Sequence, residues 1–295
     1  MSSFAEALKS GTFAVTTEMV PPKGTDLAPL LEKAEMLKGL VDGFNLTDSA
    51  SSRMTMAPLA VAHLLLDRGV EPILQFTCRD RNRIALQSDL LSAHALGISD
   101  VLCMSGDDPT AGDHPDAKPV FDLDAITLLR AISSLNAGED MTGHRLRGAP
   151  SFFVGAVANP GAADLDKELR RMEEKIAAGA GFFQTQGVYD PRAFETFMGG
   201  ARRLGVPVLA GHILLKSADM ARRLNATLPG FFVPDEVIRD LDEAEGRPEK
   251  SVEVAARVIE QIKPLCQGIH IMAIGWESRI PEVLRAAGIK TAPEG

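Results

Sequence analysis

The chain has 295 residues, a net charge of −9 at neutral pH and an isoelectric point near 5.2. Its length suits one large domain or two small ones, its apolar content of 45% excludes disorder, and its acidic balance without a basic block argues against a nucleic-acid partner. Three scattered cysteines, a polar N-terminal stretch and the lack of any apolar run of membrane-spanning length predict a soluble, cytoplasmic protein with free thiols and no membrane partner.

Strand-like apolar segments alternate with segments of helical spacing. The run FAVTTE at 13–18 is followed by leucines at helical spacing over 27–37. In chain order the sequence then predicts a strand at 43–47, a helix at 57–68, a strand at 72–78, a helix at 82–96, a strand at 100–105, a helix at 122–136, a strand at 151–158, a helix at 165–176, a strand at 181–186, a helix at 191–204 and a strand at 206–213.

Extra helices are predicted after the seventh strand, and Gly246 and Pro248 break the pattern between two of them. The remaining elements are helices at 217–224, 234–244 and 250–264, a strand at 268–274 and a helix at 279–287. Eight strand–helix units predict a closed (β/α)8 barrel, a TIM barrel, in which residues 1–295 form a single domain. The strands are continuous apolar runs, as expected for parallel strands covered by helices. A doubly wound open sheet is the alternative.

Polar residues at the strand ends are the candidate site residues, because the active site of such a barrel lies at the carboxyl ends of its strands. Glu18 ends the first strand beside a double proline, where a buried charge is costly unless it is used. The others are Thr47, Asp48, Gln75, Thr77, Arg79, Asp80, Gly106, Asp107, Asp108, Asn159, Gln184, Gln186, His212, Gly275 and Trp276. Their convergence at one mouth indicates more than a structural role.

Each candidate also has a structural interpretation. Asp107 is typical of a turn cap, and Gln186 of an amide that bonds to the backbone. His212 and Trp276 are typical packed side chains, and Lys175, beside two glutamates, is typical of a solvated helix face.

Motifs for several other chemistries are absent. The sequence has no GxGxxG after a strand, no GxxxxGK loop, no HExxH and no GxSxG. No histidine cluster supports a metal site. The sequence therefore favours acid–base chemistry and polar recognition over nucleophilic or metal chemistry.

The order of several segments resembles the methylenetetrahydrofolate reductase family, in its shorter microbial form. These segments, which cover nearly the whole chain, are TTEMVPPKG, FNLTDSAS, QFTCRD, SGDDP, GAVANP, AAGAGFFQTQGVYD, AGHILL and GIHIMAIGWE. The resemblance implies a flavoprotein barrel that binds FAD at its mouth and interconverts 5,10-methylenetetrahydrofolate and 5-methyltetrahydrofolate, a step of one-carbon metabolism and methionine biosynthesis. It also implies a nicotinamide cofactor, NADH or NADPH, as electron donor, and a homo-oligomer.

The resemblance further implies roles for single residues. Glu18 matches the general acid that protonates the leaving amine when the substrate ring opens, and a carboxyl shielded from water has the raised pKa that suits this task. Asp107 and Gln186 match residues that bind the pterin, and Trp276 lies at the substrate end. The residues implied to bind the cofactors are Thr47, Asp48, Ala50, Gln75, Ser105, Gly106, Asp107, Asn159 and Lys175.

Four positions depart from the family at the implied flavin site. Asp48 stands where many relatives have Tyr, Gln75 where they have His, Ser105 where they have Arg, and Asn159 where they have His. Arg79 is a candidate to restore the lost positive charge. These departures leave open a flavin-independent reductase, with direct hydride transfer from the nicotinamide, and a non-catalytic folate-binding subunit. A methyltransferase barrel would need a zinc–cysteine set or a corrinoid partner, which the scattered cysteines do not support.

Overall fold

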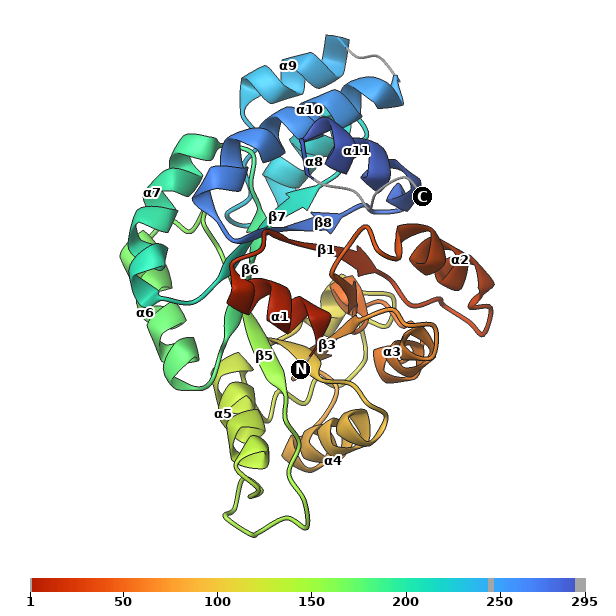
Figure 1. Ribbon diagram of the computed structural model, residues 1–295, viewed down its shortest axis with the longest axis vertical. Helices are drawn as coiled ribbons and strands as arrows, with labels where there is room; N and C mark the ends of the chain where they lie inside the picture. Colours follow the sequence, from red (N-terminus) through yellow and green to blue (C-terminus); the bar gives the residue numbers. More distant parts are fainter. Residues whose placement is uncertain (1, 244–246, 290–295) are drawn as a thin grey trace.

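The structure is a computed structural model that describes residues 2–243 and 247–289. Eight parallel strands close into a barrel in sequential order, with β1 hydrogen-bonded to both β2 and β8 (Figure 1). The strands are β1 (Ala14–Met19), β2 (Gly43–Leu46), β3 (Pro72–Thr77), β4 (Asp100–Met104), β5 (Phe153–Ala158), β6 (Phe182–Gly187), β7 (Val208–Ile213) and β8 (Gly268–Met272). The predicted (β/α)8 barrel is confirmed, and the open sheet is excluded.

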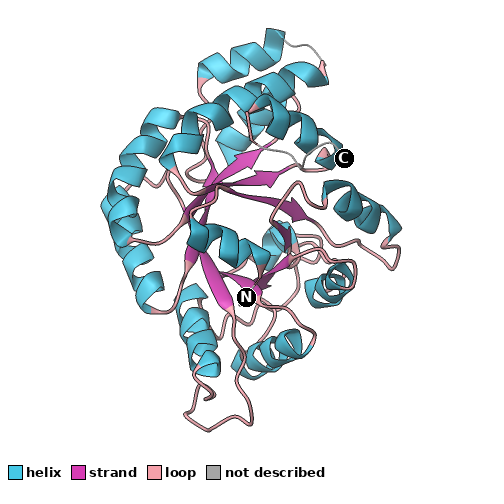
Figure 2. Cartoon of the chain, viewed as in Figure 1, coloured by secondary structure: helices cyan, strands magenta, loops and turns pink. Residues whose placement is uncertain are grey.

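Helices surround this barrel (Figure 2). They are α1 (Ser3–Ser10), α2 (Ala28–Leu37), α3 (Pro58–Leu66), α4 (Arg83–Ala95), α5 (Ala125–Asn136), α6 (Leu165–Ala177), α7 (Pro191–Ala201), α8 (Ala218–Thr227), α9 (Asp235–Glu243), α10 (Pro248–Ile262) and α11 (Ile280–Ala286). The helix predicted at 122–136 begins only at Ala125, because Asp124 caps it in a capping box with Thr127.

The extra helices predicted between the seventh and eighth strands are present as α8, α9 and α10, which lie together on one side of the barrel (Figure 1). They enclose a second small core with Tyr189 and Phe231. Pro248 occupies the first turn of α10, where its missing N–H costs nothing. Residue 244, the predicted end of the second extra helix, and Gly246 lie outside the described residues.

Helix α1 was not predicted, and it closes the amino-terminal end of the barrel (Figure 1). Phe4 is fully buried, and its ring lies 5.1 Å from that of Phe182 on β6 and 6.2 Å from that of Phe153 on β5. Leu8 packs into the same cluster, one helical turn further on. This apolar plug shuts one end of the barrel and leaves the carboxyl ends of the strands as its mouth.

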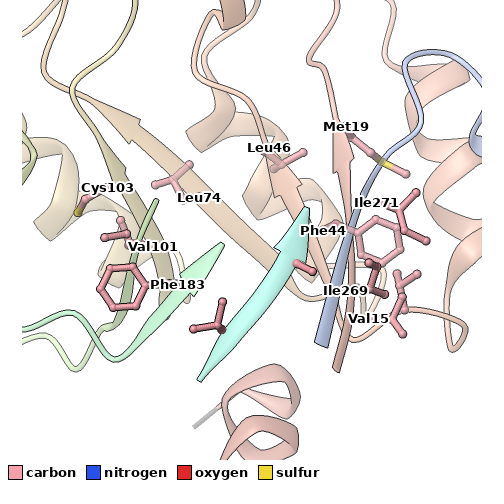
Figure 3. Close-up of a cluster of buried hydrophobic side chains, with 14 of the residues drawn as sticks. Val15, Met19, Phe44, Leu46, Leu74, Val101, Cys103, Phe183, Ile269 and Ile271 are labelled. Atoms are coloured by element: carbon pink, nitrogen blue, oxygen red, sulfur yellow. The ribbon is translucent and has the colours of Figure 1, made fainter. Parts of the chain in front are cut away.

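Strand alternation separates an apolar outer face from an inner face that is polar at mid-height. The outer side chains pack under the helices, among them Phe44, Phe183 and Ile269 (Figure 3). Their sequence neighbours Asn45 and Gln184 point the opposite way, into the barrel. Polar groups are thus carried toward the mouth by strands whose outer faces hold the fold together.

Candidate active site

Glu18 borders two clefts at the mouth of the barrel. The first, here called the deep cleft, has a volume of about 670 Å³, within the range of small-molecule sites. Predicted site residues that line it are Glu18, Asp48, Ala50, Gln75, Ser105, Gly106, Asp107, Asn159, Lys175 and Gln186. The structure therefore brings together most of the residues singled out in the sequence.

The second, here called the outer cleft, has a volume of about 950 Å³. It lies between α2 and the loops that follow β1, β2, β4 and β8. Glu18, Ala50 and Ser51 line both clefts, so the side chain of Glu18 stands where the two spaces meet.

Glu18 lies near the end of β1, paired in register with Asn45 on β2. Gln75 on β3 donates a hydrogen bond from Nε2 to Oε2 of Glu18, at 3.2 Å. Burial raises the pKa of the Glu18 carboxyl, and the hydrogen bond from Gln75 opposes this only in part. The position thus holds a carboxyl whose proton persists to higher pH than that of an exposed glutamate.

A polar network crosses the barrel below Glu18. Asn45 Nδ2 donates to Gln184 Oε1 at 2.7 Å, and Gln184 Nε2 donates to Thr16 Oγ1 at 3.1 Å. Thr16 Oγ1 in turn lies 2.9 Å from Nδ1 of His270, whose pKa burial lowers to about 3. A neutral imidazole and satisfied amides give the floor of the deep cleft a fixed geometry. Thr16, Asn45 and His270 were not predicted from the sequence as site residues. The pattern that could have indicated them is a single polar residue on the inward face of each of several apolar strands.

The loop after β2 separates the two clefts, and three of its serines have the left-handed backbone conformation. Ser49, Ser51 and Ser52 have φ between 51° and 54°, which costs about 1–3 kcal/mol for each non-glycine residue. Asp107 holds this loop: its Oδ2 accepts from the amide of Ser51 at 3.1 Å, and its carbonyl accepts from Oγ of Ser52 at 2.9 Å. The turn after β4 is capped instead by Asp108. Capping as the role of Asp107 is therefore wrong, because its carboxylate reaches across to the neighbouring loop.

The carboxylate of Asp48 makes its hydrogen bonds and its ion pair with other residues of the protein. Its Oδ2 accepts from the amide of Thr77 at 2.9 Å and from the Thr77 hydroxyl at 2.8 Å, and it pairs with Arg81. The guanidinium of Arg79 is bonded to the neighbouring Asp80, with Nη2 at 2.8 Å. Asp48 thus ties the ends of β2 and β3 together, and the positive charge of Arg79 is neutralised at the edge of the cleft.

Helix α6 lines the far end of the deep cleft with two cationic side chains and the carboxylate of Glu168. Lys175 is buried, donates from Nζ to the carbonyl of Val157 on β5 at 2.6 Å, and has a pKa lowered by burial. A solvated face for Lys175 is therefore wrong, because the helix presents this residue to the barrel. Arg171, one turn earlier, lines the same end of the cleft and was missed in the sequence. Asn159 fixes the nearby turn, since its Oδ1 accepts from the amide of Gly161 at 3.1 Å.

Close backbone approach shapes the wall of the deep cleft after β4. Gly106 has φ of 93°, and a Cβ there would lie 3.0 Å from the Cβ of Arg79, so only glycine fits without strain. Ser105, just before it, is exposed at the rim. Gln186 lies in a bulge of β6, where its Oε1 accepts from the amide of Gly187 at 3.0 Å. The side chain of Gln186 thus bonds to the backbone, as its structural interpretation predicts, and it also lines the deep cleft.

Of the residues implied to bind substrate or cofactor, Thr47 and Trp276 border neither cleft. Thr47 is buried, and its hydroxyl has no hydrogen-bond partner within the described part of the chain. Trp276 packs against the core, with Nζ of Lys216 5.6 Å from the centre of its ring. His212 is confirmed as a packed side chain: it is fully buried with its ring 4.8 Å from that of Tyr189, and burial lowers its pKa to about 4.

Residues 2–243 and 247–289 contain neither a metal-binding cluster nor a membrane-spanning helix. No cluster of three or more His, Cys, Asp or Glu side chains is arranged to hold a metal ion. Within the same residues, every helix is too short or too polar to cross a bilayer.

Comparison with known proteins identifies the family to which the chain belongs. The family model described as methylenetetrahydrofolate reductase matches residues 3–288. A maize protein named methylenetetrahydrofolate reductase (NADH) 1 is 25% identical over 97% of this chain and 46% of its own length. A Pectobacterium carotovorum 5,10-methylenetetrahydrofolate reductase is 23% identical over 84% of this chain and 79% of its own length. The chain spans less than half of several eukaryotic relatives, for example 42% of one from Caenorhabditis elegans.

Solved structures share the fold. A Clostridium thermocellum protein, described as binding two copies of 5-methyl-5,6,7,8-tetrahydrofolic acid, has a TM-score of 0.65 and 15% identity over 96% of this chain and 97% of its own. An EDTA monooxygenase from Chelativorans has a TM-score of 0.57 and 13% identity over 94% of this chain and 95% of its own. At these identities the similarity establishes the barrel and no more.

Proposed function

The chain belongs to the methylenetetrahydrofolate reductase family, and we propose that it interconverts 5,10-methylenetetrahydrofolate and 5-methyltetrahydrofolate by hydride transfer, with Glu18 as general acid and base. The observation that carries the proposal is the position of Glu18, a carboxyl of raised pKa at the junction of the two clefts. The folate-binding barrel from Clostridium thermocellum supports a folate ligand for this architecture.

Glu18 acts on the substrate ring. In its neutral form it donates a proton to the amine that leaves as the five-membered ring opens, which generates the iminium that accepts hydride. In the reverse direction the carboxylate takes the same proton back. Gln75, which holds Oε2 of Glu18, positions the carboxyl, and its weak hydrogen bond leaves Oε1 to face the substrate.

Asp107 and Gln186 would recognise the pterin head. Asp107 accepts one hydrogen bond from the backbone with its side chain, which leaves acceptor capacity for an amino group. Gln186 offers an amide that both donates and accepts. An acid after β4 and an amide on β6, both lining the deep cleft, therefore suit the edge of a pterin, which carries both donors and acceptors.

Support for FAD as the occupant of the deep cleft comes from the charged and polar side chains that line it. Arg171 and Lys175 offer two positive charges one helical turn apart for the phosphates. Gln75 and Ser105 offer polar groups on the side of the ring. Arg171 and Lys175 would hold the phosphates of FAD, which would supply the hydride-transfer chemistry between NADH or NADPH and the one-carbon unit.

Direct transfer of hydride from the nicotinamide to the folate is the second candidate. It is favoured by the carboxylates of Asp48 and Asp107, which line the deep cleft. It is also favoured by the ion pair of Arg79 with Asp80, which neutralises a positive charge at the edge of that cleft. The two candidates share Glu18 and differ in what occupies the deep cleft. A spectrum of the purified protein with and without FAD distinguishes them.

The decisive variant for Glu18 is Glu18→Gln, which keeps the shape and removes the proton. Reduction of bound flavin by NADH or NADPH should be unchanged, while turnover of folate falls by about 10²–10⁴, the usual contribution of a general acid. Glu35→Gln, the same change on the exposed face of α2, is the control. Retention of folate turnover by Glu18→Gln refutes the assigned role.

A further inference from the structure

We propose that the outer cleft binds the p-aminobenzoyl-glutamate tail of the folate, and that Arg53 recognises its carboxylates. The proposal rests on the proposed function and adds a specificity-determining residue to it. Arg53 lines the outer cleft and lies just after the loop that separates the two clefts.

The path of the tail follows from the position of Glu18. The reacting pterin must lie beside Glu18, which lines both the deep and the outer cleft, so these two clefts offer paths away from it. The hydride donor must also reach the pterin, and Arg171 and Lys175, which outnumber the carboxylate of Glu168 at that end of the deep cleft, suit the phosphates of a dinucleotide. The benzoyl-glutamate tail is left with the outer cleft.

The outer cleft offers apolar surface of the right kind. Val20, Met54 and Ile274 line it and are 55%, 49% and 51% exposed, which is unusual for large apolar side chains gathered in one place. They come from three different loops. Pro21 and Pro22 beside Val20 stiffen one wall. A planar benzoyl ring would cover this surface and remove it from water.

Charge in the outer cleft singles out Arg53. Lys23 is paired with Asp113, and Lys33 with Glu277 at 2.9 Å. Arg53 makes no ion pair or side-chain hydrogen bond with any residue in 2–243 or 247–289. A guanidinium binds a carboxylate through two parallel hydrogen bonds, so Arg53 suits the end of a glutamate.

The segment that carries Arg53 is held on both sides. The amide of Met54 donates to Oδ1 of Asp113 at 3.0 Å, and the amide of Met56 donates to the carbonyl of Pro22 at 2.8 Å. These bonds join the loops after β1, β2 and β4. Arg53 therefore projects from a fixed backbone, which a specific contact with a ligand requires.

The test combines a variant with a shortened substrate. Arg53→Ala should raise KM for methylenetetrahydrofolate about tenfold, because it removes about one ion pair with the substrate. The values of kcat and of KM for the nicotinamide should stay within twofold of wild type. With methylenetetrahydropteroate, which lacks the glutamate, wild type and Arg53→Ala should have equal KM values. Arg130→Ala, at an exposed site on α5, is the control, and Arg53→Lys should restore part of the affinity.

A binding measurement separates this inference from the proposed reaction. Saturation-transfer NMR should detect p-aminobenzoyl-glutamate on the wild-type protein and lose the signal with Arg53→Ala. An unchanged KM in the variant, or an equal rise with both substrates, overturns the role of Arg53 while the reaction stands. Fragment binding through Arg53 without turnover of any folate overturns the reaction and leaves the tail site in place.

Discussion

Asp100 should make the stability of the barrel depend on pH. It begins β4, is fully buried, and shares the inward face of the strand with Leu102, next to the plug formed by α1. Burial raises the pKa of Asp100 to about 7; the hydroxyl of Ser2 opposes the shift and the carboxylate of Glu71 adds to it. We predict that Asp100→Asn removes a pH-dependent loss of stability.

The sign and size follow from proton binding. An unfolded chain releases the Asp100 proton near pH 4, whereas the folded protein keeps it to about pH 7. Stability is therefore lost as the pH rises through this window. One pKa unit corresponds to about 1.4 kcal/mol, so the full effect is about 4 kcal/mol, of which about 2–3 kcal/mol falls between pH 5 and pH 8.

The assay is urea denaturation of wild type and Asp100→Asn at pH 5, 6, 7 and 8. The free energy of unfolding of the variant, relative to wild type, should rise by about 2–3 kcal/mol from pH 5 to pH 8. Asp116→Asn, at an exposed position, should give a constant difference. A constant difference for Asp100→Asn as well would refute the reasoning, since the carboxyl would then ionise alike in both states.

Further changes test the apolar plug of α1, the deep cleft and the role of Glu18 as an acid. Phe4→Ala should lower the free energy of unfolding by about 3–5 kcal/mol, measured by urea denaturation, because it empties the end of the barrel. Gly106→Ala should cost about 1–3 kcal/mol and weaken FAD binding in a fluorescence titration, since its φ of 93° and its contact with Arg79 exclude a side chain. Lys175→Met should keep the fold, as judged by circular dichroism, but raise the Kd for FAD about tenfold. Folate reduction by wild type should fall as the pH rises through the raised pKa of Glu18 in a stopped-flow pH profile, and a rate that rises with pH would contradict its role as an acid.

The barrel was predictable because its signal is local. Each strand is a short apolar run and each helix has its own spacing, so the order of elements follows from the sequence without knowledge of contacts. Helix α1 was missed because its stability comes from the barrel: Phe4 and Leu8 are its only two large apolar residues, and they are buried by strands far along the chain.

The candidate site was predictable at the strand ends and not beyond them. Glu18 and Gln186 follow from their positions on β1 and β6. The partner of Lys175 is a carbonyl on β5, 18 residues away, and the partner of Asp107 is an amide on the loop after β2, 56 residues away. Such contacts depend on how neighbouring strands are staggered, which the sequence of one chain does not state.

The most direct test of the proposed reaction is an anaerobic absorption spectrum of the freshly purified protein with FAD, before and after addition of 5-methyltetrahydrofolate. We predict flavin bands that bleach when the folate is added, because the folate returns its hydride through the site at Glu18. Flavin bands that persist with excess 5-methyltetrahydrofolate, in a protein that also fails to oxidise NADH or NADPH with methylenetetrahydrofolate, would contradict the account.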